Sequence, residues 1–408
     1  MNLILKLAWR NLWRNKRRTL ITMASVFFAV ILATLMMSIK QGVYTNMTES
    51  MVGSYTGFAQ IHANGYWDEK SLDISFELSD SLRDVLDNQK GLDAYVSRIE
   101  SFALSATRET TRGAMVVGTD VDAEKQMTGM HERVSEGEYL NPEDKSVLVG
   151  AGLAEYHKIG VGDTLVLLGQ GYHGSNAAGK YAVKGIVKFG SPELSKQLTI
   201  LPIAEAMNLY GTEGMITNIV LLPKDADDAV KLSEELSKNL GSRYEVMPWP
   251  ELIPDLVAMI EADRAEGYIF MFILYMVISF GIFGTVLMML AERKHEFGVL
   301  VAVGMKRSKL AAVVFFETVT IALLGAFSGI FGAMPVITYF YLNPIRFDGG
   351  DDMQRVYEEY GMEAVLQASV EPSIFIQQAS IVAMVACVIA IYPFFHVLRI
   401  SAIKAMRA

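Results

Sequence analysis

Two glycine-rich stretches carry the spacing most suggestive of phosphate chemistry. Residues 169–174 fit the pattern G-x-G-x-x-G, and residues 174–180 fit the first seven positions of a phosphate-binding loop. A dinucleotide site places its pyrophosphate on the N-terminus of a helix, but the strand-like segment Tyr181–Val187 follows these glycines. A phosphate-binding loop needs Ser or Thr after its lysine to hold magnesium, and Tyr181 occupies that position. The sequence therefore predicts a hairpin loop here, and no cofactor bound by this chain.

Side chains that could build a metal or catalytic site are scattered along the chain. No histidine has metal-site spacing to another histidine or to the single cysteine. The sequence contains no G-x-S-x-G nucleophile elbow and no paired-carboxylate motif. We therefore predict no metal site and no catalytic residue, which disfavours a hydrolase. The histidines are His62, His131, His157, His173, His295 and His396.

Glu317 stands inside a long apolar run, Leu310–Tyr341. A charge within a membrane span is costly and often functional, whereas a place near the interface or a hydrogen bond to a neighbouring helix gives a structural explanation. Gly325, Gly329 and Gly332 follow at a spacing that lets two helices approach closely. The sequence leaves open whether this glycine face packs within one chain or forms a dimer.

The composition indicates a membrane protein with a substantial water-exposed part. The chain has 408 residues, of which 51% are apolar and 20% charged, and its mean hydropathy is +0.28. A soluble domain is rarely so apolar, and a pure helical bundle is rarely so charged. Cys387 is the only cysteine, so no disulfide within one chain can form.

Four segments have the length and apolar character of membrane-spanning helices. The segment Thr19–Ile39 contains 21 uncharged residues, enough at 1.5 Å per residue to cross roughly 30 Å of hydrocarbon. It is too long for the apolar core of a cleaved signal peptide, so we expect an uncleaved anchor. The third segment is unusually long, and we expect a kink at its proline or an extension beyond the bilayer. The other predicted spans are residues 268–290, 310–341 and 373–398.

Basic residues cluster on one side of these spans. Residues 1–18, 291–309 and 399–408 together contain 14 Lys and Arg but two acids. The positive-inside rule therefore predicts that these three segments lie in the cytoplasm. Residues 40–267 and 342–372 are then predicted to lie outside.

The N-terminal segment, residues 1–18, has the pattern of a helix lying in the cytoplasmic membrane interface. Tryptophans on one face would sit at headgroup level, and basic residues on another would face the headgroups. Nucleic-acid binding is the alternative for a basic N-terminus, and the apolar span that follows at once disfavours it. The predicted interfacial anchors are Trp9, Arg10, Trp13, Arg14, Arg17 and Arg18.

The sequence predicts an α+β domain in the outer segment 40–267. We expect helical stalks at its two ends, which continue the first two membrane-spanning helices. The acidic loop 342–372 is predicted to hold a short helix over Met353–Gln367. Predicted strands cover residues 59–62, 101–107, 113–117, 146–149, 164–168, 180–188, 198–201 and 216–222, and predicted helices cover 78–88, 150–157, 204–210 and 226–240.

Between the second and third spans lies a short amphipathic run, residues 292–304. Phe297, Leu300 and Gly304 recur at helical spacing. We expect Gly304 to end this helix with a positive φ, and Ser308 to cap the next helix. An ordinary turn at the membrane surface would have the same chemistry.

The amino-acid sequence of this run resembles a motif of the FtsX/MacB/LolC-LolE family of ABC-transporter permeases, E-R-x-x-E-[IF]-G-x-L-x-A-x-G. Residues 146–168 are similar to an element of that family's periplasmic core domain, and the basic N-terminus and the ending 400–407 also fit. In the family the run is a coupling helix that docks on an ATPase. The matching positions are Glu292, Arg293, Glu296, Phe297, Gly298, Leu300, Ala302 and Gly304.

The resemblance implies a fold of four transmembrane helices with a large MacB-like α+β domain inserted between the first two. It implies a bacterial inner-membrane permease that is not itself an enzyme and transmits motion from a cytoplasmic ATPase dimer holding ATP and magnesium. A second permease subunit, identical or not, completes it. The likeness is greatest to LolC/LolE-type permeases, which implies a lipoprotein substrate and a periplasmic carrier. The alternatives are a scaffold that activates a cell-wall hydrolase or a sensor kinase, and a MacB-like efflux permease.

Overall fold

The computed structural model describes residues 3–14, 16–189, 191–346 and 365–400. Its chain divides into two compact units. Unit 1 contains residues up to 44, 260–346 and those from 365 onward, and unit 2 contains residues 45–259.

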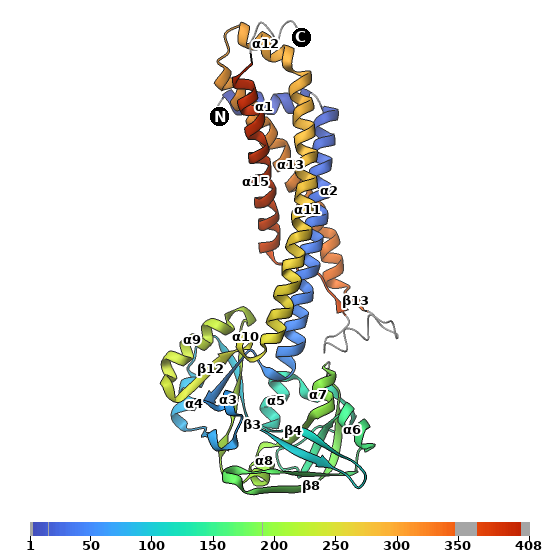
Figure 1. Ribbon diagram of the computed structural model, residues 1–408, viewed down its shortest axis with the longest axis vertical. Helices are drawn as coiled ribbons and strands as arrows, with labels where there is room; N and C mark the ends of the chain where they lie inside the picture. Colours follow the sequence, from blue (N-terminus) through green and yellow to red (C-terminus); the bar gives the residue numbers. More distant parts are fainter. Residues whose placement is uncertain (1–2, 15, 190, 347–364, 401–408) are drawn as a thin grey trace. The chain divides into compact units, whose positions relative to one another are not determined.

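Unit 1 is a helical bundle. Among the described residues, four helices are long and apolar enough to cross a membrane, and Figure 1 shows them side by side. Most extend beyond the predicted spans, which fits helices that continue past the hydrocarbon as stalks. Two short helices complete the unit. The long helices are α2 (Lys16–Thr48), α11 (Pro254–Glu292), α13 (Arg307–Leu342) and α15 (Pro372–Leu398), and the short ones are α1 (Leu3–Arg14) and α12 (Lys294–Ala302).

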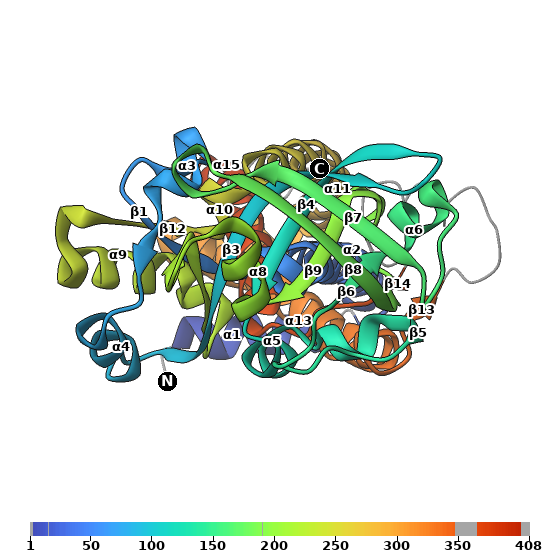
Figure 2. The ribbon, with the colours of Figure 1, turned by 90° about the horizontal axis from the view of Figure 1, so that it is seen from below.

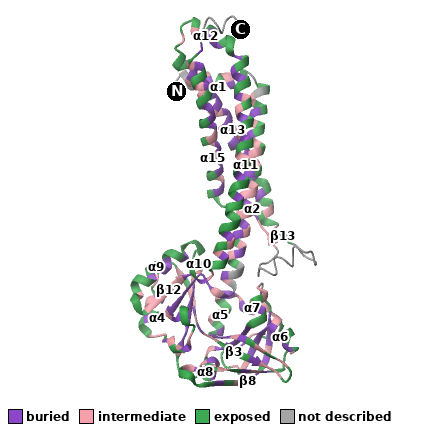
Figure 3. Ribbon diagram, in the orientation of Figure 1, coloured by how far each residue is buried: buried purple, intermediate pink, exposed green. Residues whose placement is uncertain are grey.

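The exposed surface of the bundle is itself apolar. Figure 3 shows exposed residues recurring along the long helices, and these include Phe28, Phe272, Phe280 and Phe331. Large apolar side chains facing outward along whole helices are expected where lipid is the surrounding solvent.

The glycine face of α13 packs against α2 of the same chain. A Cβ atom added to Gly325 would lie 2.7 Å from the Cβ of Val26, and one added to Gly329 would lie 2.9 Å from the Cβ of Val30. At Gly332 the nearest neighbour is the ring of Phe27, also 2.9 Å away. These close contacts favour packing within one chain over a dimer face. Helix α13 runs unbroken through Pro335.

Most of the helix predicted over Met353–Gln367 lies outside the described residues. Where the loop returns, Val365–Leu366 forms a strand (β14) paired with Ile345–Arg346 (β13), so the helical prediction is wrong there. The amide of Ser369 then donates to the carbonyl of Ser38 at 2.9 Å. At residues 365–366, backbone pairing with Ile345–Arg346 takes the place of the helix that the sequence pattern suggested.

Unit 2 is built on one sheet that contains ten strands among the described residues, in the order β12-β1-β11-β3-β4-β9-β6-β8-β5, with β7 pairing with β3 and β8. Figure 2 shows the neighbours β4, β9, β6 and β8. The strands are β1 (Ala59–Ala63), β3 (Leu92–Ala106), β4 (Thr111–Thr119), β5 (Val134–Gly137), β6 (Ser146–Gly150), β7 (Thr164–Gln170), β8 (Asn176–Val187), β9 (Leu198–Pro202), β11 (Asn218–Pro223) and β12 (Tyr244–Pro248), with the separate pair β2 (Phe76–Glu77) and β10 (Met215–Ile216).

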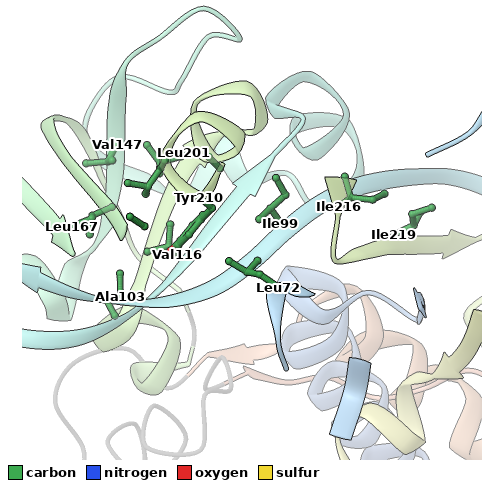
Figure 4. Packing of buried hydrophobic residues seen from close by; sticks show 14 of the residues in the cluster. Leu72, Ile99, Ala103, Val116, Val147, Leu167, Leu201, Tyr210, Ile216 and Ile219 are labelled. Carbon is green, nitrogen blue, oxygen red and sulfur yellow. The ribbon is translucent and has the colours of Figure 1, made fainter. Parts of the chain in front are cut away.

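Helices cover this sheet and close its core. Ile99, Val116, Leu201 and Tyr210 pack together in the largest buried cluster (Figure 4). The α+β prediction for this region is confirmed, although α3, α5, α7, β2, β5 and β12 were missed. The helices are α3 (Tyr66–Glu69), α4 (Asp80–Asp87), α5 (Val121–Thr128), α6 (Ala151–His157), α7 (Pro192–Gln197), α8 (Ile203–Tyr210), α9 (Ala229–Leu240) and α10 (Trp249–Leu252).

The glycine-rich stretch 169–180 lies in a β-hairpin, as predicted: it contains the end of β7, the connecting residues 171–175 and the start of β8. Strands β7 and β8 pair antiparallel, with Leu165 opposite Tyr181 and Gln170 opposite Asn176. Lys180 lies within β8, so a strand follows the glycines instead of the helix that a phosphate site requires.

Candidate functional site

The run 292–304 forms a short helix, α12, set off from its neighbours at both ends. Arg293 leaves regular helical geometry (φ −93°, ψ 6°) between α11 and α12. At the other end Gly304 has φ +102°, a conformation that glycine adopts without strain, so the predicted helix stop is confirmed. The prediction for Ser308 is wrong: Lys306 is the N-cap residue of α13, and Ser308 lies inside its first turn.

A buried ion pair joins α12 to α13. Nη1 of Arg293 donates to both carboxylate oxygens of Glu317 at 2.8 Å. Nδ2 of Asn11, on α1, donates to Oε2 of Glu317 at 3.3 Å. Both charged side chains are buried, and a buried charge is tolerated only when it is paired and hydrogen-bonded. Of the two readings of Glu317, the structure supports a hydrogen-bonded partner on neighbouring helices.

A second acid extends this network to the surface. Glu296 accepts a hydrogen bond from Arg14 of α1, and Nε of Arg293 lies 3.3 Å from its Oε2. Partial burial would raise the pKa of Glu296, but the hydrogen bonds and charges of Arg14 and Arg293 hold that pKa below its ordinary value. Three separate segments of the sequence therefore meet in one network of alternating charges.

Phe297 faces the interior of unit 1. Its side chain is 0% exposed, in the same buried cluster as Leu310, Ala311 and Val314 of α13. The Cζ atom of Arg293 lies 5.1 Å from the ring centroid, within cation–π range. The assignment of Phe297 to the surface that docks on the ATPase, which the family resemblance implied, is therefore wrong, because the ring lies in the chain's own core. Gly298 is also buried.

The exposed apolar surface of α12 is made by other residues. Leu300 is 37% exposed, Val299 40% and Val303 83%. Ala302, Gly304 and Glu292 are exposed as well. Sequence reasoning included Leu300 but missed the two valines, although their spacing of four residues places them on one face of a helix.

The predicted interfacial anchors lie on α1 and at the start of α2. Trp9 and Trp13 are exposed and stack edge to face with centroids 6.1 Å apart. Arg10, Arg14 and Arg17 are exposed, and the side chain of Arg18 is outside the described residues. Sequence reasoning missed that Arg14 and Asn11 contact the network, because residues so distant in sequence give no pattern.

A small cavity of about 30 Å³, lined in large part by apolar side chains such as Ile282 and Met289, adjoins the ion pair. Threonine side chains line it beside the charges, among them Thr22, Thr285 and Thr318. This volume suits one or two water molecules. Among the described residues, no group of three His, Cys, Asp or Glu side chains could hold a metal ion. The site is thus a buried charged contact between helices with a small cavity beside it.

Comparisons with known proteins agree with this architecture. Residues 19–239 match the MacB-like periplasmic core domain, and residues 268–402 match the FtsX-like permease C-terminal domain. The first match alone covers more than half of the chain.

Individual relatives are distant. The lipoprotein-releasing system transmembrane protein LolC of Xylella fastidiosa is 22% identical over 59% of this chain and 59% of its own length. LolC of Neisseria meningitidis is 21% identical over 79% of this chain and 76% of its own. The macrolide export ATP-binding/permease protein MacB of Burkholderia thailandensis is 21% identical over 80% of this chain and 50% of its own. The chain thus matches only about three-fifths of the first relative's length.

The domain matches, the four apolar helices and the α/β unit give one consistent assignment. The chain belongs to the FtsX/MacB/LolC family of ABC-transporter permeases.

Proposed function

We propose that this chain is a mechanotransmitting permease subunit whose substrate is a lipoprotein released from the inner membrane. A separate cytoplasmic ATPase dimer, which holds ATP and magnesium, would close on ATP and displace α12. A second permease subunit would complete the transporter, and a periplasmic carrier would receive the lipoprotein. No catalytic step is assigned to this chain itself.

One observation carries the mechanical part of the proposal: an exposed apolar helix is fastened to the bundle by buried charges. Val303 and Leu300 give α12 a surface that can be covered by a partner. The Arg293–Glu317 pair ties the base of that same helix to α13. A short helix that has an exposed contact surface and is firmly attached to the bundle is better suited to transmitting force than to binding a substrate.

The proposed topology follows from charge. Residues 1–18, α12 with its flanking links and the last residues of the chain carry the excess of Lys and Arg and are assigned to the cytoplasm. Residues 40–267 and 342–372 are assigned to the periplasm. The bounds of α2 and α11 include residues of both units, which gives a helical connection between the bundle and the outer domain.

Depletion of the chain in its native host tests the substrate. We expect acylated lipoproteins to accumulate in the inner membrane, and a chain carrying Val303→Asp to fail to restore their release. Normal lipoprotein sorting after depletion would contradict the proposal. Radiolabelled lipoproteins separated by membrane density would provide the measurement.

The similarity to MacB over 80% of the chain favours one other candidate, an efflux permease. Under that function depletion would raise sensitivity to macrolides and leave lipoprotein sorting intact. The same depletion strain therefore separates the two functions.

A further inference from the structure

We propose that Glu317 is a positioning residue for α12, and that its ion pair with Arg293 is the joint through which a displacement of α12 reaches α13. The inference rests on the proposed function, because it takes α12 as the contact with the ATPase. It adds which helix receives the displacement and which side chains pass it on.

The backbone at the ends of α12 does not by itself fix the direction of this helix. Arg293 breaks the regular geometry where α11 ends, and Gly304 adopts a left-handed conformation before α13 begins. A helix bounded by two such residues takes its orientation from side-chain contacts.

The strongest of these contacts lead to α13. Arg293 is the N-cap residue of α12, and its guanidinium holds both oxygens of Glu317, which lies three turns into α13. Phe297, one turn further along α12, packs in one cluster with Leu310 and Val314 of α13. A buried ion pair at the start of α12 and a buried aromatic ring one turn later thus hold α12 against α13.

Contacts further along α13, with α2, leave little room to absorb such a displacement. Its glycine face lies so close to α2 that even one methyl group at Gly325 or Gly329 would meet α2 atoms at 2.7–2.9 Å. Closely packed helices transmit displacements because their interfaces are not continuously deformable. Side chains in direct contact therefore link α12 to α13 and α13 to α2, and a displacement of α12 can pass along them.

A buried ion pair permits a test that separates positioning from simple stabilisation. Removing one partner leaves the other charge buried and unpaired, which destabilises the fold. A single variant would therefore lose stability whether the pair positions α12 or only stabilises the bundle. Replacing both partners of a buried ion pair by hydrophobic residues of similar volume is often tolerated by the fold. The double variant Arg293→Met/Glu317→Met should therefore fold but lose the directional contact between the two helices.

The experiment compares this double variant with the wild-type chain, each assembled with the host ATPase in lipid nanodiscs. We expect the melting temperature and ATPase co-purification to be retained. Substrate-stimulated ATP turnover should fall by up to about 100-fold, the loss in rate that a small misplacement far from the chemistry can cause. Tyr275→Phe is the matched control, since it removes the hydrogen bond from Tyr275 to Gln378 within the same bundle but far from α12.

A second readout needs no ATPase. In a Cys387→Ser background, spin labels replace Val303, the C-cap residue of α12, and Phe316 on α13, both exposed. The distance distribution between the labels should be narrow with the ion pair and broad in the double variant. Wild-type ATP turnover together with a narrow label-to-label distance distribution in the double variant would overturn the proposal. An equal loss of ATP turnover in the Tyr275→Phe variant would overturn it too.

These outcomes also separate this inference from the proposed function. A wild-type chain that binds no ATPase would refute the function, while the label distances would still decide the joint. Should the double variant fail to fold, Glu317→Asp keeps the charge but shortens its reach. It should then broaden the distribution, and an unchanged distribution would overturn the proposal.

Discussion

The Cζ atom of Arg293 lies 5.1 Å from the ring centroid of Phe297, and both side chains are buried. The aromatic residue of the run 292–304 is therefore part of the bundle core, beneath the charge that pairs with Glu317. Its removal should affect stability first and partner binding second.

Phe297→Ala should destabilise unit 1 by about 3–5 kcal/mol, the usual cost of emptying a buried aromatic site. Phe297→Leu should recover much of this loss because it refills most of the volume. Thermal unfolding of the full chain in detergent measures both. A Phe297→Ala chain as stable as wild type, yet unable to bind ATPase, would show instead that the ring serves the partner.

Val303→Asp should have the opposite profile. Val303 is 83% exposed, so its replacement should change stability by no more than about 0.5 kcal/mol. If this surface meets the ATPase, a charge at its centre should weaken binding by about 2 kcal/mol or more, roughly 30-fold.

Co-purification at graded ATPase concentrations measures that affinity. Val230→Asp is the matched control, because Val230 is an exposed valine on α9, in unit 2. Equal binding by the Val303→Asp and Val230→Asp chains would exclude the α12 surface as the docking site.

Gly329→Ala should destabilise the bundle by about 1–3 kcal/mol, the common cost of overpacking a tight interface. Its new methyl group would lie 2.9 Å from the Cβ of Val30 and from the carbonyl of Phe27. Gly281→Ala on α11 is the control, since nothing lies within 4 Å of its added Cβ. That change should be neutral or stabilising by up to about 1 kcal/mol. Similar melting temperatures for the two variants would contradict the close α2–α13 packing.

The sequence pattern correctly predicted those features of the fold that depend on neighbouring residues in the chain: the long helices, one hairpin and one helix end. The uncharged runs located the long helices, because a span is defined by length and hydropathy alone. The alternating residues around 164–188 located the β7–β8 hairpin, in which Tyr181 pairs with Leu165. Gly304 marked the end of α12 through its own backbone preference.

The site itself depended on contacts that no local pattern contains. Arg293 and Glu317 are 24 positions apart, and Asn11 and Glu317 are 306 apart. Helical periodicity identified an apolar face on residues 297–304 but could not say whether Phe297 faced a partner or the chain's own bundle. That choice is made by the angle at which α12 leaves Arg293, a tertiary property.

The last prediction concerns acid stability of unit 2 and centres on His62. Burial, and then the charge of Lys70, lower the pKa of this imidazole to about 3. An unfolded chain would bind the proton near pH 6.5, while the folded chain stays neutral down to about pH 3. Stability is therefore fully present at neutral pH and is lost as the pH falls below about 6.5, because the unfolded state then binds more protons.

Between pH 7 and pH 5 this single group should remove about 2 kcal/mol of stability. Hydrogen exchange of β1 and β11 amides in the full chain, corrected for intrinsic rates, measures the change. His62→Phe keeps a ring against Tyr66, which stacks on His62 with centroids 5.3 Å apart, but cannot titrate, so it should flatten the pH dependence. His173→Phe, at an exposed histidine of the β7–β8 turn, should leave it unchanged. If both variants retain the wild-type slope, another group must take up the proton, and the buried imidazole is not the acid-sensitive element of this domain.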